Sequence, residues 1–201
     1  MALCGLTLRK YLINKNALPD EPLVALVPVS TRASDESATY QNRVTGLLAE
    51  LGTDEDDPLA LLGRVQTSMS RAKTNLQAIP AATLQDFTQF APPLIAARAM
   101  RMYSRLRIAD RLNPPFNLII SNVPGPTVPL YSSGAEMKHF FPVSTIADGQ
   151  GLNITVQSYL GNLDFGFVSC RELIPDLWEL VELLHQSLDE MLSAARSLAG
   201  K

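Results

Sequence analysis

Residues 152–169 read LNITVQSYLGNLDFGFVS, and this stretch decides the fold class. Polar and apolar side chains alternate over residues 152–159 and again over 163–169, which is the period of a strand with two different faces. Gly161-Asn162 stands between the two runs, and a Gly-Asn pair in that place is typical of a hairpin turn. The stretch therefore predicts two antiparallel strands joined at Gly161-Asn162.

Further strands are predicted upstream of this hairpin. Residues 23–29, LVALVPV, form a buried strand in which Pro28 has no N–H to donate, so Pro28 is expected at a sheet edge or a strand end. Residues 42–51 fit a helix or a strand equally well, because a short apolar run is ambiguous. Strand is also expected at 116–121, before a proline-glycine loop at 122–129, and within 135–146, broken at Pro142.

Helices are predicted between and around these strands. Residues 54–58, DEDDP, open a helix to about residue 78, because they supply a capping Asp, a proline for the first position and negative charge at the positive end of the dipole. No second ligand cluster faces these acids, so we interpret them as a cap and not as a metal site. The other expected helices span 2–13, 82–90, 92 to before Asn113, and 175 to about 196, the last with Leu177, Leu180, Val181, Leu184, Leu188, Met191 and Leu192 on its apolar side.

These elements together predict one α/β domain, an α+β sandwich of helices on a mixed, largely antiparallel sheet. The helix expected at residues 2–13 begins without a capping residue, so it looks cut. In the helix that starts at Pro92-Pro93, Arg98, Arg101 and Arg105 line up beside an apolar stripe. Two interpretations stay open for these arginines: a solvated face, or a surface for anionic lipid or a phosphate-bearing substrate.

Composition narrows the classes of function. The chain has 201 residues, of which 46% are hydrophobic and 18% charged, as in a globular protein with a real core. Its formal net charge of −3 argues against a nucleic-acid partner. Its longest apolar run, residues 23–29, is far shorter than a membrane span, so we expect any membrane association to be peripheral. Cys4 and Cys170 fit no metal or redox spacing and are expected to be reduced, inert thiols of a cytosolic protein.

The chain's two histidines, His139 and His185, are candidates for proton transfer. In strand register His139 shares a face with Met137 and Phe141, and His185 lies near Trp178 at the edge of the last helix's apolar side. Neither has an orienting carboxylate at local spacing, so both are interpreted as structural or half-exposed. The serines Ser30, Ser121 and Ser144 lack the context of a nucleophile elbow, which argues against an independent serine hydrolase.

A series of motifs runs along essentially the whole chain. Each motif alone is weak, but their order and spacing together are specific. They are LRKYL (8–12), LPD (18–20), PLVALVPVS (22–30), TDEDDP (53–58), SNVPGP (121–126), PLY (129–131), GA (134–135), GLNITV (151–156), SY (158–159), FG (165–166) and PD (175–176). In this order they resemble the C-terminal domain of the bacterial wax ester synthase/diacylglycerol acyltransferase family.

This resemblance implies the C-terminal half of a coenzyme A-dependent acyltransferase fold, in which two similar halves pack with a tunnel between them. It also implies the reaction, transfer of a fatty acyl group from coenzyme A to diacylglycerol or a long-chain alcohol. The family's catalytic motif, His-His-x-x-x-Asp-Gly, belongs to the N-terminal half and is absent from this sequence. The family's Asn-Asp pair would fall just before Met1. The chain also departs from the family at Gln41, where glycine is usual, and at Leu160 and Cys170, where aspartate is common.

The loop at 122–126 is the best local candidate for a site. Its asparagine can donate and accept hydrogen bonds, and its Pro-Gly-Pro backbone is rigid. Two interpretations stay open: the loop lines the tunnel and faces the N-terminal half, or it is a rigid connection between strands. The substrate-tunnel or interface candidates are Ser121, Asn122, Pro124, Gly125 and Asn153, and the residues expected to be structural are Gly149, Gly151 and Gly161 as turn formers and Asp164, Phe165 and Gly166 as a brace for the tunnel.

We therefore expect residues 1–201 to be the C-terminal domain of such an O-acyltransferase, inactive alone because the histidine motif is missing. Acyl-CoA is expected as a substrate, with no cofactor, no metal and no nucleic acid. The alternative is a noncatalytic lipid- or partner-binding domain that complements a separate catalytic half. The expected location is the cytoplasm, with peripheral attachment to the inner face of the plasma membrane or to lipid inclusions as a further possibility.

Overall fold

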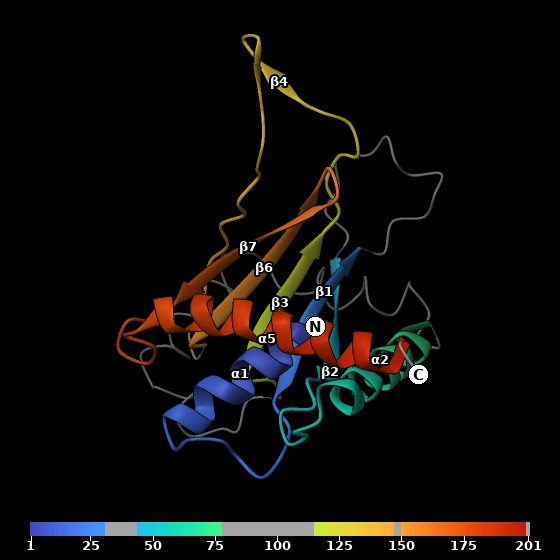
Figure 1. Cartoon of the computed structure of the whole chain (residues 1–201), viewed down its shortest axis with the longest axis vertical. Coiled ribbons are helices and arrows are strands. Elements are labelled where there is room, and N and C mark those ends of the chain that lie inside the picture. Colours follow the sequence, from blue (N-terminus) through green and yellow to red (C-terminus); the bar gives the residue numbers. More distant parts are fainter. Residues whose placement is uncertain (31–43, 78–114, 147–149, 200–201) are drawn as a thin grey trace, which may run out of the picture.

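A five-stranded sheet organises the described part of the computed structural model, which comprises residues 1–30, 44–77, 115–146 and 150–199 (Figure 1). The predicted helices at 82–90 and from 92, with Arg98, Arg101 and Arg105, lie outside the described residues, as do Gln41 and Gly149. The helices are α1 (Ala2–Asn14), α2 (Pro58–Gln77) and α5 (Leu177–Ala199), and the strands are β1 (Val24–Ser30), β2 (Val44–Glu50), β3 (Leu118–Val123), β4 (Tyr131–Ser132), β5 (Ala135–Glu136), β6 (Leu152–Tyr159) and β7 (Asn162–Ser169).

The sheet has the order β2-β1-β3-β6-β7 and is mixed. The outer pairs β1–β2 and β6–β7 are antiparallel and long, and the inner pairs β1–β3 and β3–β6 are parallel and shorter. This arrangement confirms the predicted fold class, and it shows that the described residues 44–50 of the ambiguous segment 42–51 form strand β2. Pro28 pairs with Gly46 of β2 and lies beyond Ala25 and Leu26, the two residues of β1 that pair with β3. The missing N–H of Pro28 therefore breaks no ladder on the β3 side.

Helices α1 and α5 cross one face of this sheet (Figure 1). Cys4, Leu8 and Tyr11 of α1 share one apolar core with buried residues of α5, β1, β2, β3 and β6, and half-buried side chains of β7 pack against it. The other side of α1 packs on α2, so α1 is buried on most of its surface. A side chain at Gly5 would lie 2.3 Å from the carbonyl oxygen of Leu51, so glycine allows this close approach.

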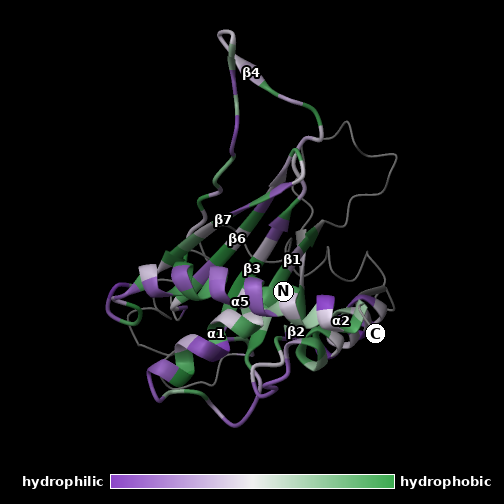
Figure 2. Ribbon diagram, in the orientation of Figure 1, coloured by the Kyte–Doolittle hydropathy of each residue, from purple (hydrophilic) through white to green (hydrophobic). Residues whose placement is uncertain are grey.

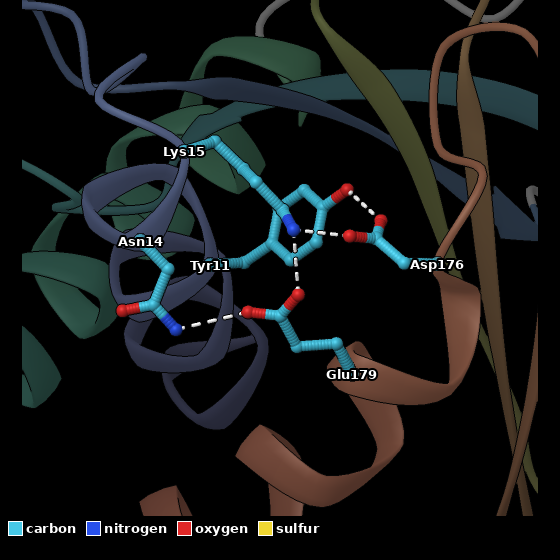
Figure 3. Close-up of polar contacts among 5 residues, drawn as sticks. All are labelled: Tyr11, Asn14, Lys15, Asp176 and Glu179. Atoms are coloured by element: carbon cyan, nitrogen blue, oxygen red, sulfur yellow. Dashed lines mark hydrogen bonds and ion pairs between the residues drawn. The ribbon is translucent and has the colours of Figure 1, made fainter.

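Polar contacts tie the end of α1 to the start of α5 (Figure 3). The Tyr11 hydroxyl donates to Asp176 Oδ1 at 2.6 Å, and Lys15 forms ion pairs with Asp176 and Glu179. Asn14 Nδ2 adds a hydrogen bond to Glu179 Oε1 at 2.9 Å. Hydrogen bonds from Lys15 and then Tyr11 lower the pKa of Asp176 from 3.8 to about 2. The first and last helices of the chain are therefore joined both by apolar packing and by charge.

The predicted cap of α2 is confirmed. Asp57 Oδ1 accepts hydrogen bonds from the N–H groups of Leu59 and Ala60 at 2.9 and 2.7 Å, and Pro58 occupies the first helical position. Asp54, which precedes α2, forms an ion pair with Arg64 of that helix instead, with 2.7 Å between Oδ2 and Nη1. The acidic run is thus used to begin and brace a helix.

The last helix differs from the predicted one in its bounds and in its buried stripe. It begins at Leu177 and reaches Ala199, and its buried residues are Leu180, Leu183, Leu184 and Ser187. Leu188 and Leu192, which we expected on the apolar side, are each 43% exposed. The stripe is rotated because α5 packs on the sheet core and on α1 together. Leu183 joins that core and Ser187 is buried, whereas the two exposed leucines do not contribute to it.

The hairpin β6–β7 is confirmed, with its turn shifted by one residue. Tyr159 pairs with Asn162, so the two turn residues are Leu160 and Gly161 and not Gly161-Asn162. Their φ angles are +48° and +83°, the left-handed pair that a two-residue hairpin turn requires. Gly161 adopts this conformation without strain, whereas Leu160 adopts it against its usual preference.

The strand predicted within residues 135–146 is confirmed only for the two residues of β5, and the prediction is wrong for the rest of the segment. β5 pairs with β4, which we did not predict, in a small separate hairpin. Residues 138–146, the crossing segment, run beside β6 and β7 and are held by side chains rather than by a backbone ladder. An added Cβ at Gly166 would lie 1.8 Å from the carbonyl oxygen of Pro142, so the segment passes directly over this glycine.

Candidate functional site

The loop after β3 lies at the carboxyl end of a parallel strand, where ligands of open α/β sheets commonly bind. Ser121 is half-buried within β3, and Asn122, Val123 and Pro124 are exposed. The described part of the chain gives the Asn122 side chain no hydrogen-bond partner. Of the predicted candidates, Asn122 is therefore the one whose polar group is open to an incoming molecule.

Gly125 fastens this loop to the end of β6. Its N–H donates to Ser158 Oγ at 3.0 Å, and an added Cβ would lie 1.8 Å from the Ser158 carbonyl oxygen. The Leu160 N–H donates to the Pro126 carbonyl at 3.4 Å. Any side chain at Gly125 would push the loop away from β6, so this glycine positions the loop by close approach.

Asn153 lies apart from the loop and has a buried side chain whose amide nitrogen and oxygen each have a hydrogen-bond partner. Its Nδ2 donates to the Thr145 carbonyl at 3.0 Å, and its Oδ1 accepts from Thr155 Oγ1 at 3.1 Å. Thr155 in turn shares a 2.7 Å hydrogen bond with Ser144. Asn153 thus holds the crossing segment on β6 through Thr145, and Ser144 holds it there through Thr155.

His139 has a carboxylate partner that the sequence analysis missed. Its Nδ1 lies 3.0 Å from Asp164 Oδ1, and Asp164 Oδ2 accepts the Phe140 N–H at 2.7 Å. Burial would raise the pKa of Asp164, but the hydrogen bonds from Phe140 and His139 lower it below its ordinary value. The one signal in the sequence was the position of Asp164 inside a predicted strand, since a carboxylate that a strand buries needs hydrogen-bond partners.

Both histidines line one apolar groove of about 530 Å³ between β7 and α5. His139 stacks on Phe141 with ring centroids 5.4 Å apart, although the strand register from which we expected the two to share a face is not formed there. His185 Nδ1 contacts the Val181 carbonyl at 2.9 Å, within its own helix. The rest of the groove is mainly aromatic and aliphatic, with Phe165, Phe167, Leu177 and Trp178 among its walls.

A larger hollow of about 930 Å³ lies between β2 and α2, and none of the predicted site residues lines it. Its wall includes Arg64, which Asp54 already pairs, and Arg71. It is open, with a lining about as apolar as polar, and it lies on the opposite edge of the sheet from the histidine groove. These two hollows of the described part of the chain therefore lie at the two sheet edges, and no residue of the loop at 121–126 lines either of them.

The residues that we expected to be structural have different roles in the fold. Gly161 forms the hairpin turn as predicted. Gly151 has no left-handed φ, so the turn conformation that we expected there is not formed. An added Cβ would lie 3.1 Å from Cδ1 of the exposed Leu173 side chain. Phe165 packs against the core from β7.

The cysteines are free thiols in the described part of the chain. Cys4 lies in the core, where burial raises the pKa of its thiol. Cys170 is half-buried, and its Sγ donates to Glu172 Oε2 at 2.9 Å. None of the helices that the structure describes is both long enough and apolar enough to cross a bilayer.

Comparison with known proteins identifies the family. Residues 40–192 match the model of the WS/DGAT C-terminal domain. A Mycobacterium tuberculosis protein named "Probable diacyglycerol O-acyltransferase tgs2" is 40% identical over 96% of this chain and 42% of its own length. The O-acyltransferase WSD of Acinetobacter baylyi is 36% identical over 94% of this chain and 39% of its own length.

A solved structure agrees with these sequences. The wax ester synthase/diacylglycerol acyltransferase from Marinobacter aquaeolei VT8 superposes with a TM-score of 0.75 and 32% identity, over 96% of this chain and 42% of that one. The chain therefore spans about two fifths of the length of the relatives it matches. The resemblance seen in the motifs is confirmed, and the chain belongs to the wax ester synthase/diacylglycerol acyltransferase C-terminal domain family.

Proposed function

We propose that this chain is the C-terminal domain of an O-acyltransferase that moves a fatty acyl group from acyl-CoA to diacylglycerol or a long-chain alcohol. The observation that carries the proposal is the family match over residues 40–192, together with the structural match to a wax ester synthase over 96% of the chain. The relatives' names supply the two acceptor classes. In this proposal the chain acts with a catalytic N-terminal part, and no cofactor is needed besides the substrate acyl-CoA.

Acyl transfer to an alcohol needs a base that takes the hydroxyl proton, which typically contributes about 10²–10⁴ in rate. The sequence has no His-His-x-x-x-Asp-Gly motif. His139 is held by Asp164, but it lies at the groove on β7, and its ring serves to anchor the crossing segment. We therefore propose that the chain alone does not catalyse the reaction and that neither histidine replaces the missing motif.

The contribution of this domain would be to shape the tunnel wall. Asn122 is the residue that would contact a substrate or the facing half, since its amide is exposed at the end of β3. Ser121, Pro124 and Gly125 would set its position, and Gly125 does so through its contact with Ser158. Asn153 would act at a distance by holding the crossing segment. The domain would bind its substrates in the cytoplasm. Any attachment to the inner face of the plasma membrane or to lipid inclusions would be peripheral.

The experiment compares this chain alone with the same chain fused behind the N-terminal part of the Marinobacter enzyme. Radiolabelled acyl-CoA is supplied with diacylglycerol or hexadecanol, and ester is measured. We expect no ester from the chain alone and ester from the fusion. Ester from the chain alone would sink the claim of inactivity, and a folded fusion that makes none would sink the proposed function.

Variants of the fusion test the residue roles. Asn122→Ala should lower kcat/KM about tenfold if its amide contacts substrate, since a lost polar contact of this kind costs about 1–3 kcal/mol. Asn162→Ala changes an exposed asparagine at the start of β7 and should leave the rate unchanged. His139→Gln should also leave the rate within about twofold, whereas loss of a general base would cost at least about 10².

A further inference from the structure

The groove between β7 and α5 holds polar groups that the proposed function does not use. Its volume is about 530 Å³, and sites for small molecules usually measure about 300–1,000 Å³. β7 is an edge strand of the sheet, and the first turns of α5 pass beside it (Figure 1). Figure 2 shows hydrophobic residues along β7 in this region. No residue of the loop at 121–126 lines the groove, so the groove is a separate candidate site.

The two histidines of the groove are held with the same ring nitrogen protonated. His185 Nδ1 lies 2.9 Å from the Val181 carbonyl, which can only accept, so this partner assigns the proton to Nδ1. His139 Nδ1 lies 3.0 Å from Asp164 Oδ1. Although burial raises the pKa of Asp164, hydrogen bonds from Phe140 and His139 lower it below its ordinary value, so this carboxylate is ionised and accepts as well. In each neutral ring Nε2 then keeps a lone pair.

Both of these Nε2 atoms are open to a donor from outside. The His139 side chain is 53% exposed, and His185 is exposed on α5. Both rings line the groove, and neither Nε2 has a hydrogen-bond partner in the described part of the chain. The groove therefore offers two hydrogen-bond acceptors, which an O–H group can satisfy.

The charges of the groove exclude an anionic ligand. Neither lysine nor arginine is among the described residues that line it, and its one carboxylate belongs to Asp164. This carboxylate is buried, and each of its oxygens already accepts a hydrogen bond. A fatty acid anion or a phosphate group would meet a like charge and no cation, which is unfavourable away from water. The chemistry that fits is an uncharged molecule with a hydroxyl group.

The walls of the groove are suited to a hydrocarbon chain. The rings of Phe165 and Phe167 stack along β7 with centroids 6.4 Å apart. Phe141 from the crossing segment and Trp178 from α5 line the groove as well, and they are 65% and 79% exposed. An alkyl chain that lies between them would remove both aromatic surfaces from water, which is the main driving force for binding apolar molecules.

We propose that this groove is a noncatalytic binding site for a neutral long-chain alcohol. The hydroxyl donates to Nε2 of His139 or His185, and the alkyl chain lies against Trp178 and the aromatic wall of β7. The inference goes beyond the proposed function and does not rest on it, because the acceptors, the missing cations and the apolar walls of the groove specify the ligand by themselves.

Trp178 provides the measurement, since it is the chain's single tryptophan and lines the groove. The 201-residue chain is titrated with 1-decanol, decyl methyl ether and decanoate, each below the concentration at which it aggregates. We expect a saturable blue shift of the emission with decanol, because the indole leaves water. The ether has no O–H to donate and should bind about tenfold more weakly. Decanoate should bind no better than the ether.

Variants locate the site. Val181→Phe places a larger side chain in the groove and should weaken decanol binding at least about tenfold through a clash. The matched control is Leu192→Phe, at an exposed position of α5 that does not line the groove, and it should bind decanol as the unchanged chain does. The double variant His139→Leu/His185→Leu should lose the preference for decanol over the ether and still bind the ether.

Each contrary result overturns the inference. These are the absence of a saturable shift with decanol, equal affinity for decanol and the ether, tighter binding of decanoate, equal weakening in Val181→Phe and Leu192→Phe, and a preference that survives in the double variant. Emission that shifts when the protein is diluted without ligand would also overturn it, since a second copy would then cover Trp178. If circular dichroism shows that the double variant is unfolded, the three ligands on the unchanged chain decide alone.

Ester synthesis by the fusion with the Marinobacter N-terminal part separates the two proposals. A chain that binds decanol in the groove and makes no ester when fused removes the proposed function and keeps the groove site. An active fusion, together with a chain that binds no decanol, does the opposite.

Discussion

The two faces of β6 are both buried, but by different chemistry. Leu152, Ile154 and Val156 enter the apolar core beneath α1 and α5. The alternate residues are polar and just as inaccessible, and they lie under the crossing segment and the loop that follows β3: Asn153, Thr155, Gln157 and Tyr159. Apolar burial is not directional, so the first face sets which layers pack. Hydrogen bonds are directional, so the polar face determines where the loop after β3, the crossing segment and the β4–β5 hairpin are held.

The largest expected effect tests the apolar face. Ile154→Ala should lower the free energy of unfolding by about 2–5 kcal/mol, because it leaves a cavity in the core. Urea denaturation followed by circular dichroism measures the change. Leu163→Ala, at an exposed position of β7, should change it by less than about 0.5 kcal/mol. Similar losses in the two variants would mean that the face beneath the helices is not the main source of stability.

The next effect tests the polar face. Thr155→Val should lower the free energy of unfolding by about 1–3 kcal/mol, because it removes the hydroxyl shared by Ser144 and Asn153 and leaves their polar groups buried without it. Faster hydrogen exchange is expected in the crossing segment, with little change in α1. Thr155→Ser keeps the hydroxyl and should keep most of the protection. A Val variant as stable as the natural chain would show that the hydrogen bonds on this face contribute little.

A smaller effect, of opposite sign, comes from a polar atom on the apolar side. Ser187 of α5 is fully buried, and its Oγ has no hydrogen-bond partner in the described part of the chain. Ser187→Ala should raise the free energy of unfolding by about 1 kcal/mol, since it removes an unsatisfied group and favours the helix. Ser197→Ala is the control, because the Ser197 hydroxyl is exposed and donates to Ala194. Destabilisation by Ser187→Ala would indicate a partner for this hydroxyl.

The smallest effect lies at the rim between α1 and α5 and depends on pH. The pKa of Asp176 falls from 3.8 to about 2 in the folded chain, so its contribution to stability is complete above about pH 4 and is lost as pH falls toward 2. Asp176→Asn should therefore flatten the dependence of stability on pH in that window. Thermal unfolding measured at steps of half a pH unit tests this. The control is Asp189→Asn, a change at an exposed position of α5, which should leave the dependence of stability on pH as it is. An unchanged slope in Asp176→Asn would refute the assignment.

Local features of the fold could be predicted from the sequence, because their causes lie within a few residues. The cap at Asp57 and the β6–β7 hairpin are of this kind. The hairpin turn was misplaced by one residue because Leu160 adopts a left-handed φ that leucine rarely adopts. The buried stripe of α5 was misplaced because its direction depends on α1, at the other end of the chain.

The candidate site shows the same limit. The loop at 121–126 could be found by its prolines and glycine, but the need for glycine at position 125 comes from Ser158, more than thirty residues away. The His139–Asp164 pair spans 25 residues and leaves no local spacing to detect. The β4–β5 hairpin could not be predicted, because its two strands are too short to show a periodic pattern. The hydrogen bond that holds its base joins Leu130 to Tyr159 of the distant strand β6.

The contact between the first and last helices also governs when the chain can fold. Tyr11 meets Asp176, Lys10 pairs with Glu190 at 2.5 Å, and β1 needs β3, whose residues lie more than ninety positions later. During synthesis α1 therefore leaves the ribosome long before α5, and the apolar surface that α5 covers stays exposed until α5 follows. Folding of this domain is expected to be slow, so the nascent chain is a natural client for chaperones.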